Sequence, residues 1–207
     1  MGRRRPIALA IAALLLLAVS AGAVACSSDD GNGGGDNGDT VNTTTFRNDE
    51  FGFSITYPED YVTAEPETTA GEETTSAYEI AFADPDGTVI DELTVDGLQI
   101  SIYQLNVEFT PEEVPDLVME FQGLVDQLVG GLENGTVEEP LSETTVNGVP
   151  GFTVTYTYTN QGNELRASSS FLVKGAYEYM VTSQATTARW DQVAPEFEAA
   201  TTSFAID

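Results

Sequence analysis

Few side chains in this sequence can carry covalent chemistry. The chain of 207 residues contains no histidine and one cysteine, Cys26. A Ser-His-Asp triad and a histidine-ligated zinc site are therefore excluded, and the sequence has no P-loop or Gly-x-Gly-x-x-Gly motif. A carboxylate pair could hydrolyse a glycoside. Among 34 acidic residues, however, pairs such as Glu112-Glu113 and Glu138-Glu139 are more typical of exposed charge in loops and at helix starts.

Cys26 stands at the end of an apolar N-terminal segment. Arg3-Arg4-Arg5 is basic, the run from Ile7 to Val19 is apolar, and Ala23-Val24-Ala25 places small residues directly before the cysteine. This order is typical of an export signal. Two alternatives stay open. The apolar stretch 6–25 approaches the roughly 20 residues that a membrane-spanning helix needs, and a plain secretory signal could be cut after an Ala-x-Ala-like site.

The same residues resemble a bacterial lipoprotein signal with its lipobox, although Ala23 replaces the usual leucine. The resemblance implies cleavage before Cys26 and diacylglycerol on its sulfur, so the thiol is unavailable for catalysis. Arg4-Arg5 leaves a twin-arginine export route open beside the general one. We expect residues 1–25 to be a signal peptide. The mature protein is then anchored by lipid to the cell membrane and faces away from the cytoplasm.

The mature chain is strongly acidic. From Cys26 onward its basic residues are Arg47, Arg166, Lys174 and Arg189, against all 34 acidic ones, which gives a formal charge of −30. Such a surface repels nucleic acid and anionic lipid headgroups. The acidic surface would attract cations or basic proteins. The alternative is that the charge only keeps the protein soluble or adapts it to a salty environment. We expect a monomer that binds a basic protein or a small molecule. We expect no nucleic-acid partner, no cofactor and no bound metal.

Composition divides the mature chain into a tether and one domain. Residues 26–42 are mostly Gly, Asn and Asp, typical of a flexible tether. Residues 43–207 alternate apolar and polar side chains in several runs, which predicts strands. The runs are 51–57, 78–82, 98–102, 141–146, 152–158, 166–173 and 177–183. Asn147-Gly148, Asn160 to Asn163 and Lys174-Gly175 read as turns.

Two segments switch to helical spacing. Thr110-Pro111-Glu112-Glu113 reads as a capping box that opens a helix, and Gly130-Gly131 ends it. The apolar positions of this helix are Leu117, Val118, Phe121, Leu124, Val125 and Leu128. A second helix carries Trp190, Val193, Phe197, Ala200 and Phe204. The sequence thus predicts an α+β domain, an antiparallel sheet of about six to eight strands with one mid-chain helix and one C-terminal helix packed against it.

Four tyrosines form the strongest candidate for a binding surface. Tyr156 and Tyr158 are two apart on one predicted strand, as are Tyr177 and Tyr179 on another, so each pair shares a face. Tyrosine is frequent at interfaces, and the set could line a ligand groove or a partner surface. The alternative is a sheet face covered by the C-terminal helix.

Four further segments carry a family resemblance, which are Phe51 to Pro58, Asn147 to Phe152, Tyr177 to Val181 and Ser203-Phe204. They resemble the PsbP-like group, which includes the actinobacterial LpqN-type lipoproteins and DcrB-like proteins. The resemblance implies an antiparallel sheet with helices packed against it. Members are known mostly as binding or accessory proteins, so no catalytic residues carry over. We expect a non-enzymatic binding or accessory lipoprotein; the alternatives are a small-molecule-capturing module for a transporter or the envelope and, third, a carboxylate-dependent hydrolase.

Overall fold

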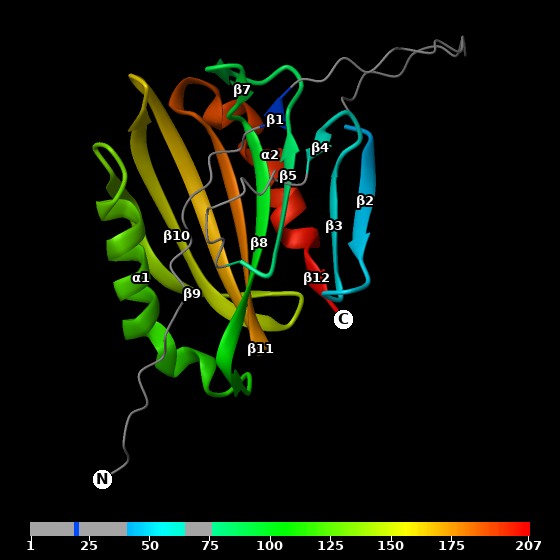
Figure 1. Cartoon of the computed structure of the whole chain (residues 1–207), viewed down its shortest axis with the longest axis vertical. Helices are drawn as coiled ribbons and strands as arrows, with labels where there is room; N and C mark the ends of the chain where they lie inside the picture. The colour runs from blue at the N-terminus through cyan, green and yellow to red at the C-terminus, as the bar shows by residue number, and fades with distance from the viewer. Residues whose placement is uncertain (1–18, 21–40, 65–75) are drawn as a thin grey trace.

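Alternating side chains build a main sheet of six antiparallel strands in the order β4-β5-β8-β11-β10-β9 (Figure 1). The computed structural model describes residues 19–20, 41–64 and 76–207. The strands are β4 (Val62–Ala64), β5 (Tyr78–Ala83), β8 (Gly97–Phe109), β9 (Thr136–Val146), β10 (Val149–Asn160) and β11 (Asn163–Thr186). The predicted fold class, α+β with about six to eight strands, is confirmed.

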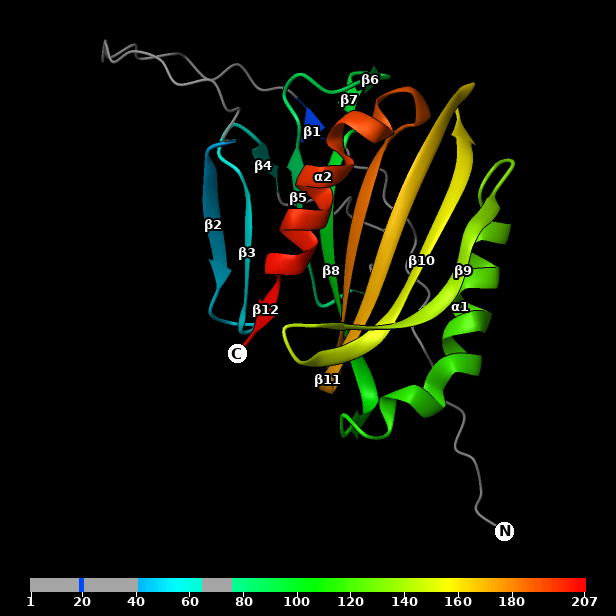
Figure 2. The same cartoon turned by 180° about the vertical axis from the view of Figure 1, so that it is seen from behind.

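Two small sheets and three helical segments complete the described part. The strands β2 (Thr43–Asn48), β3 (Phe53–Pro58) and β12 (Ala205–Ile206) form one sheet, and β1 (Val19–Ser20), β6 (Val89–Ile90) and β7 (Leu93–Thr94) form the other. The helices are η1 (Val114–Leu117, a 3-10 turn), α1 (Val118–Gly130) and α2 (Thr187–Ser203). Seen from behind, α2 crosses the main sheet and leads into β12 (Figure 2).

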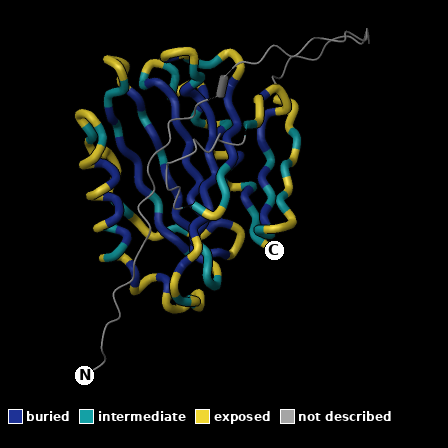
Figure 3. The backbone as a smooth tube through the Cα atoms, in the orientation of Figure 1, coloured by how far each residue is buried: buried dark blue, intermediate teal, exposed yellow. Residues whose placement is uncertain are grey.

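The core has two parts because both faces of the main sheet are covered. On β11, Phe171 belongs to the cluster on the α1 side and its neighbour Leu172 to the cluster on the α2 side. Successive side chains of a strand point to opposite faces, so the two clusters lie on opposite sides of the sheet. Phe121 of α1 contacts Phe171 on one side, and Phe204 at the end of α2 contacts Phe53 on the other. Figure 3 shows the central strands mostly buried.

The prediction of a turn at Lys174-Gly175 is wrong. β11 runs without interruption through these residues and is 24 residues long. Its first half pairs with β10 and its second half with β8. Gly175 has a φ of 61°, and the register with β8 shifts between Gly175 and Tyr177. From Gly175 to Tyr177 β11 advances by two residues while β8 runs from Phe109 to Gln104, so the extra residues of this irregularity lie on β8. Gly175, in the left-handed region that glycine tolerates, lets β11 bend at this point without ending.

Only half of the predicted capping box forms, because the Glu113 N–H donates to the Thr110 backbone oxygen and not to its hydroxyl, and this half does not cap the α-helix. The Glu113 carboxylate accepts hydrogen bonds from the Thr110 backbone N–H at 2.9 Å and from its hydroxyl at 3.0 Å. The chain then continues through η1, and α1 begins only at Val118. Val118 is 41% exposed, so its predicted place in the apolar face of the helix is wrong.

The predicted tight turns at the two ends of β10 are confirmed. Asn147-Gly148 has φ angles of 47° and 82°, and Gln161-Gly162 has 50° and 79°. Positive φ at both central positions is the geometry of two-residue hairpin turns, which favours Asn-Gly pairs. The predicted signal (1–25) and tether (26–42) lie outside the described residues except for 19–20 and 41–42. Within the described ranges, no helix has the length and apolar character to cross a membrane.

Candidate functional site

Cys26, the predicted lipid-attachment residue, lies outside the described residues. The four predicted tyrosines are divided between the two faces of the main sheet. Tyr156 and Tyr158 belong to the cluster on the α1 side, and Tyr177 and Tyr179 to the α2 side. Each pair therefore shares a face, as predicted, but the structure does not gather the four into one surface.

Three of these tyrosines have buried rings and partnered hydroxyls. The Tyr156 hydroxyl lies 3.2 Å from the Ser169 hydroxyl, and burial raises the pKa of Tyr156 to about 12. Tyr158 donates a hydrogen bond to the side-chain oxygen of Gln184, and Tyr179 donates one to the backbone oxygen of Phe51 at 3.0 Å. Three hydroxyls occupied inside the protein indicate a structural role for most of the set.

The helix α2 instead carries residues that line two hollows of the described surface. It begins directly after β11, which fixes its first turn beside the loop from β5 to β8. In that turn, Arg189 reaches two aspartates that are about one hundred residues away in the sequence. Its Nη1 donates to Asp96 Oδ2 at 2.7 Å, and its Nη2 donates to Asp84 Oδ2 at 2.9 Å.

Asp96 is the anchor of this arrangement because it is fully buried, at 0% exposure. Its carboxylate also accepts hydrogen bonds from the backbone N–H groups of Thr88 at 2.9 Å and Thr186 at 3.0 Å. Burial lowers the pKa of Arg189, but the hydrogen bond and charge of Asp84, followed by Asp96, raise it overall. The guanidinium is thus a fixed cation whose charge the two aspartates already balance.

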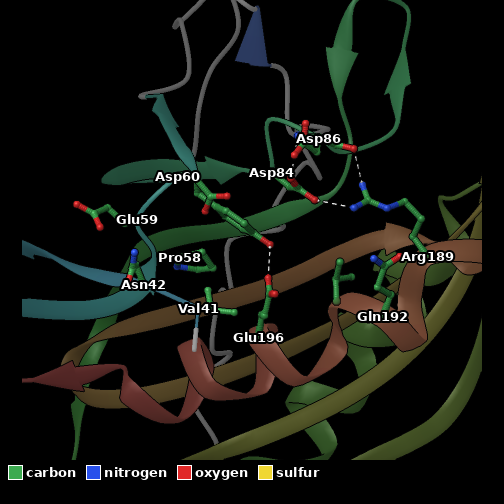
Figure 4. Close-up of a pocket in the computed structure, with 12 residues that line it drawn as sticks. Val41, Asn42, Pro58, Glu59, Asp60, Asp84, Asp86, Arg189, Gln192 and Glu196 are labelled. Atoms are coloured by element: carbon green, nitrogen blue, oxygen red, sulfur yellow. Dashed lines mark hydrogen bonds and ion pairs between the residues drawn. The ribbon is translucent and has the colours of Figure 1, made fainter. Parts of the chain in front are cut away.

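An acidic cleft of about 690 Å³ opens beside this ion pair (Figure 4). It lies between the chain entering β2, the turn after β3, the turn after β5 and one side of α2. Five carboxylates and one cation line it, which are Glu59, Asp60, Asp84, Asp86, Glu196 and Arg189. The lining therefore keeps a surplus of negative charge after Arg189 is counted.

Tyr61 also lines the acidic cleft. Its ring is buried, and its hydroxyl donates a hydrogen bond to Glu196 Oε2 at 3.3 Å. Burial, then the charges of Glu196 and Asp84, raise the pKa of the Tyr61 hydroxyl, so it stays protonated as a donor. Glu59, Asp60 and Asp86 are exposed at the rim. In the part of the chain that the structure describes, no three acidic or cysteine side chains are arranged to hold a metal ion.

A second hollow, the hydroxyl groove, lies on the other side of α2. It has a volume of about 530 Å³ and is lined by the helix and by the faces of β9, β10 and β11. Trp190 and Arg166 lie in it, with the guanidinium carbon 5.1 Å from the centre of the indole ring. Both hollows are thus built on the same helix, with Arg189 and Glu196 facing one and Trp190 and Glu198 the other.

Sequence reasoning missed both hollows. The sequence Asp84-Pro85-Asp86-Gly87 is typical of a turn, and the structure has one there, with the Gly87 N–H donating to the Asp84 backbone oxygen at 2.9 Å. Nothing in the local pattern, however, showed that Arg189 would meet Asp84. The small number of basic residues is a signal that could have been used. Each of the four basic residues of the mature chain can choose among many carboxylates, so each is a good candidate for an ion pair.

Comparisons with known proteins give a consistent family and fold. The family model described as PsbP-like protein matches residues 7–206. A search of curated proteins finds no match. The solution structure of cyanobacterial PsbP (CyanoP) from Synechocystis sp. PCC 6803 is similar with a TM-score of 0.52 and 14% identity, covering 84% of this chain and 98% of that one.

A second solved structure, LpqN of Mycobacterium tuberculosis, is described as involved in cell envelope biogenesis. It is similar with a TM-score of 0.50 and 13% identity, covering 81% of this chain and 92% of that one. At these identities the two structures support the fold, whereas the family model extends over nearly the whole sequence. The chain belongs to the PsbP-like protein family.

Proposed function

We propose that this protein is a non-enzymatic binding or accessory module of the cell envelope. Lipid on Cys26 holds it to the outer face of the cell membrane, and the acidic cleft receives a cationic group of a partner protein. The observation that carries the proposal is the charge of the cleft. Five carboxylates line it, while its one cation, Arg189, is already bound to Asp84 and Asp96.

The geometry of the cleft suits a lysine or arginine side chain. Glu59, Asp60 and Glu196 carry no ion pair in the described part of the chain, so their charges face the opening uncompensated. Glu196 is half-buried and held by Tyr61, which fixes one acceptor for an incoming donor. Hydrogen bonds in which both groups are charged are shorter and stronger than neutral ones.

The family supports the proposal in a general way. LpqN, whose fold this chain shares, is described as involved in cell envelope biogenesis. A supporting role at the envelope needs no catalytic group, and the sequence has no histidine. A second candidate function, capture of a small molecule, is favoured by one observation, the hydroxyl groove on the far side of α2.

The test uses the mature protein and a lysine-rich peptide as the probe. Glu59→Gln, Asp60→Asn and Glu196→Gln are combined in one cleft variant. A control variant combines Glu50→Gln, Glu108→Gln and Glu112→Gln, which lie on exposed positions away from the cleft and remove the same charge. At low ionic strength we expect the cleft variant to bind about tenfold more weakly than the control, and the difference to shrink with added salt.

The charge-matched control separates a site from a general attraction. Equal losses of affinity in the two variants would mean that the whole acidic surface, and not the cleft, binds cations. The native partner is sought by cross-linking in the membrane of the source cell, followed by mass spectrometry. A purified protein that hydrolyses a glycan or ester, and stops doing so when one carboxylate is removed, would overturn the non-enzymatic reading.

A further inference from the structure

The hydroxyl groove has a lining that is unusual for the space beneath a helix. A helix that covers a sheet normally buries an apolar stripe against apolar strand residues. Here nine of the described lining residues are Ser or Thr, contributed by three strands and by α2. They are Thr144, Thr145, Thr153, Thr155, Ser168, Ser170, Ser183, Thr201 and Thr202. The groove is therefore polar where a tightly packed contact would be dry.

Several of these hydroxyls have no partner within the protein. Thr155 Oγ1 donates to Glu139 Oε2 at 3.1 Å, and the hydroxyls of Ser170 and Thr153 lie 3.4 Å apart. The side chains of Ser168 and Ser183, by contrast, have no hydrogen-bond partner among the described residues. Both residues lie on β11, and Ser183 is only 4% exposed. Neither oxygen is among the described side-chain atoms that are sealed from solvent without a partner, so both hydroxyls open to the groove and can pair with a group from outside.

One end of the groove combines an aromatic surface with a fixed cation. The Arg166 guanidinium stands over the Trp190 ring, and its Nε lies 2.9 Å from Glu138 Oε2. That Nε is buried without an aligned hydrogen bond. Arginine has five N–H donors, and the ion pairs of Arg166 with Glu138 and Glu139 involve only its Nε and Nη2. The end of the groove thus offers further donors beside the half-buried indole.

We infer that the hydroxyl groove binds a neutral carbohydrate. Sugar hydroxyls donate and accept hydrogen bonds, and so do Ser and Thr hydroxyls, so the two surfaces match. Arg166 and Phe197 already contact the Trp190 ring, and the part of the half-buried indole that stays exposed can contact the apolar C–H groups of a sugar while the polar groups pair around it. The volume of about 530 Å³ lies within the usual range for small-ligand sites, about 300–1,000 Å³.

Other classes of ligand fit the groove less well. An apolar ligand would leave Ser168 and Ser183 unpaired on binding, which costs free energy. An anion would find little net attraction to Arg166, because the ion pairs with Glu138 and Glu139 already neutralise its charge. A polycation is drawn more strongly to the acidic cleft. The inference is independent of the proposed function, because the cleft and the groove use different residues on opposite sides of α2.

The experiment uses a reporter that the protein already contains. Trp190 is the only tryptophan of the chain and lines the groove, so its fluorescence reports occupancy directly. The mature protein is titrated with maltose, cellobiose and diacetylchitobiose. We expect a saturable change with at least one of them, and shifts of the amide NMR signals of Ser168, Ser183 and Thr201. Combining Ser168→Val with Ser183→Val should weaken that binding about tenfold or more, since both hydroxyl partners are lost.

Two further variants keep the result interpretable. Ala194, half-buried on α2, lines the groove, so Ala194→Phe fills it and should also weaken binding. This variant tests the inference even if the Ser168→Val, Ser183→Val variant folds poorly. Thr43→Val with Thr45→Val, on the exposed side of β2, should leave binding unchanged. The cleft variant of the previous section should bind the sugar normally. The inference is overturned when no probe gives a saturable signal by either method, or when binding persists both in the Ser168→Val, Ser183→Val double variant and in Ala194→Phe.

Discussion

The Arg189 guanidinium lies 2.7 Å from the carboxylate of Asp96, a residue with no exposed surface. The pair joins the first turn of α2 to the loop that precedes β8, and so positions the helix that separates the two hollows. Removing the cation would leave a buried carboxylate with backbone and hydroxyl donors but no opposite charge. Breaking a buried ion pair in this way is far more costly than breaking an exposed one.

We therefore predict that Arg189→Gln lowers the stability of the domain. The side chain of Arg189 is 24% exposed, so solvent screens part of the loss, and we expect a cost of about 2–3 kcal/mol. Thermal melting should show a fall of about 5–10 °C for a domain of this size. Arg47→Gln is the matched control, because its ion pairs with Asp49 and Asp207 are exposed, and it should melt like the wild type. Equal melting of both variants would contradict the anchoring role of Arg189.

Gly151 and Gly123 provide a pair of opposite predictions. A Cβ atom at Gly151, inside β10, would lie 2.0 Å from the backbone oxygen of Phe171, and at Gly123, inside α1, it would meet nothing within 4 Å. We expect Gly151→Ala to destabilise the domain by roughly 1–3 kcal/mol, as overpacking does. Gly123→Ala should stabilise it by about 0.5–1 kcal/mol, because alanine favours a helix. Urea unfolding of both variants checks the signs, and a neutral Gly151→Ala would show that the strands can separate.

The features of this fold that could be predicted are those that depend on residues close together in the sequence. Alternation located β3, β5 and β8 because Phe53, Ile80 and Ile100 each lie on a buried face. The Asn147-Gly148 turn was readable because positive φ at two successive residues favours that pair. Gly175 was misread because a glycine in a strand pattern is compatible with a turn or a bulge. Only the pairing of β11 with both β10 and β8 decides between them.

The candidate site was not predictable because its residues are close in space but distant in the chain. Asp84, Asp96 and Arg189 meet only after the sheet has formed, and each looks like ordinary surface charge in the sequence. The residues of the hydroxyl groove are likewise brought together only by the pairing of the strands. Thr155 and Ser168 face each other across β10 and β11, yet hydroxyls at alternate positions of a strand normally indicate a solvent-exposed face.

Membrane attachment rests on one sulfur atom, which makes it directly testable. We predict that Cys26→Ser moves the protein from the membrane fraction to the soluble one or leaves it unprocessed. The reason is that a serine oxygen does not replace the thiol in this lipid attachment. Metabolic labelling with a fatty-acid analogue checks the lipid, and thermal melting of the folded domain should be unchanged in the variant. Labelling that survives the substitution would contradict attachment at Cys26.

Glu178 introduces a pH dependence of stability. Its side chain is buried on β11 opposite Tyr103 of β8, and burial raises the pKa of its carboxyl from 4.5 to about 8. Between these two values the folded protein keeps a proton that the unfolded chain has released. The free energy of unfolding therefore falls as the pH rises through this window, by at most ~1.4 kcal/mol per pH unit. Above the folded pKa the loss is complete and this contribution becomes constant.

We predict that Glu178→Gln removes this loss, because a neutral amide of the same shape has no proton to release. The melting temperature of the variant minus that of the wild type should grow between about pH 5 and about pH 8. Using the difference cancels the repulsion among the other acidic residues, which also grows with pH. Glu50→Gln, at an exposed position, removes the same charge and should give a difference that hardly changes with pH. A flat difference for Glu178→Gln as well would mean that the carboxylate finds solvent or a cation within the folded sheet.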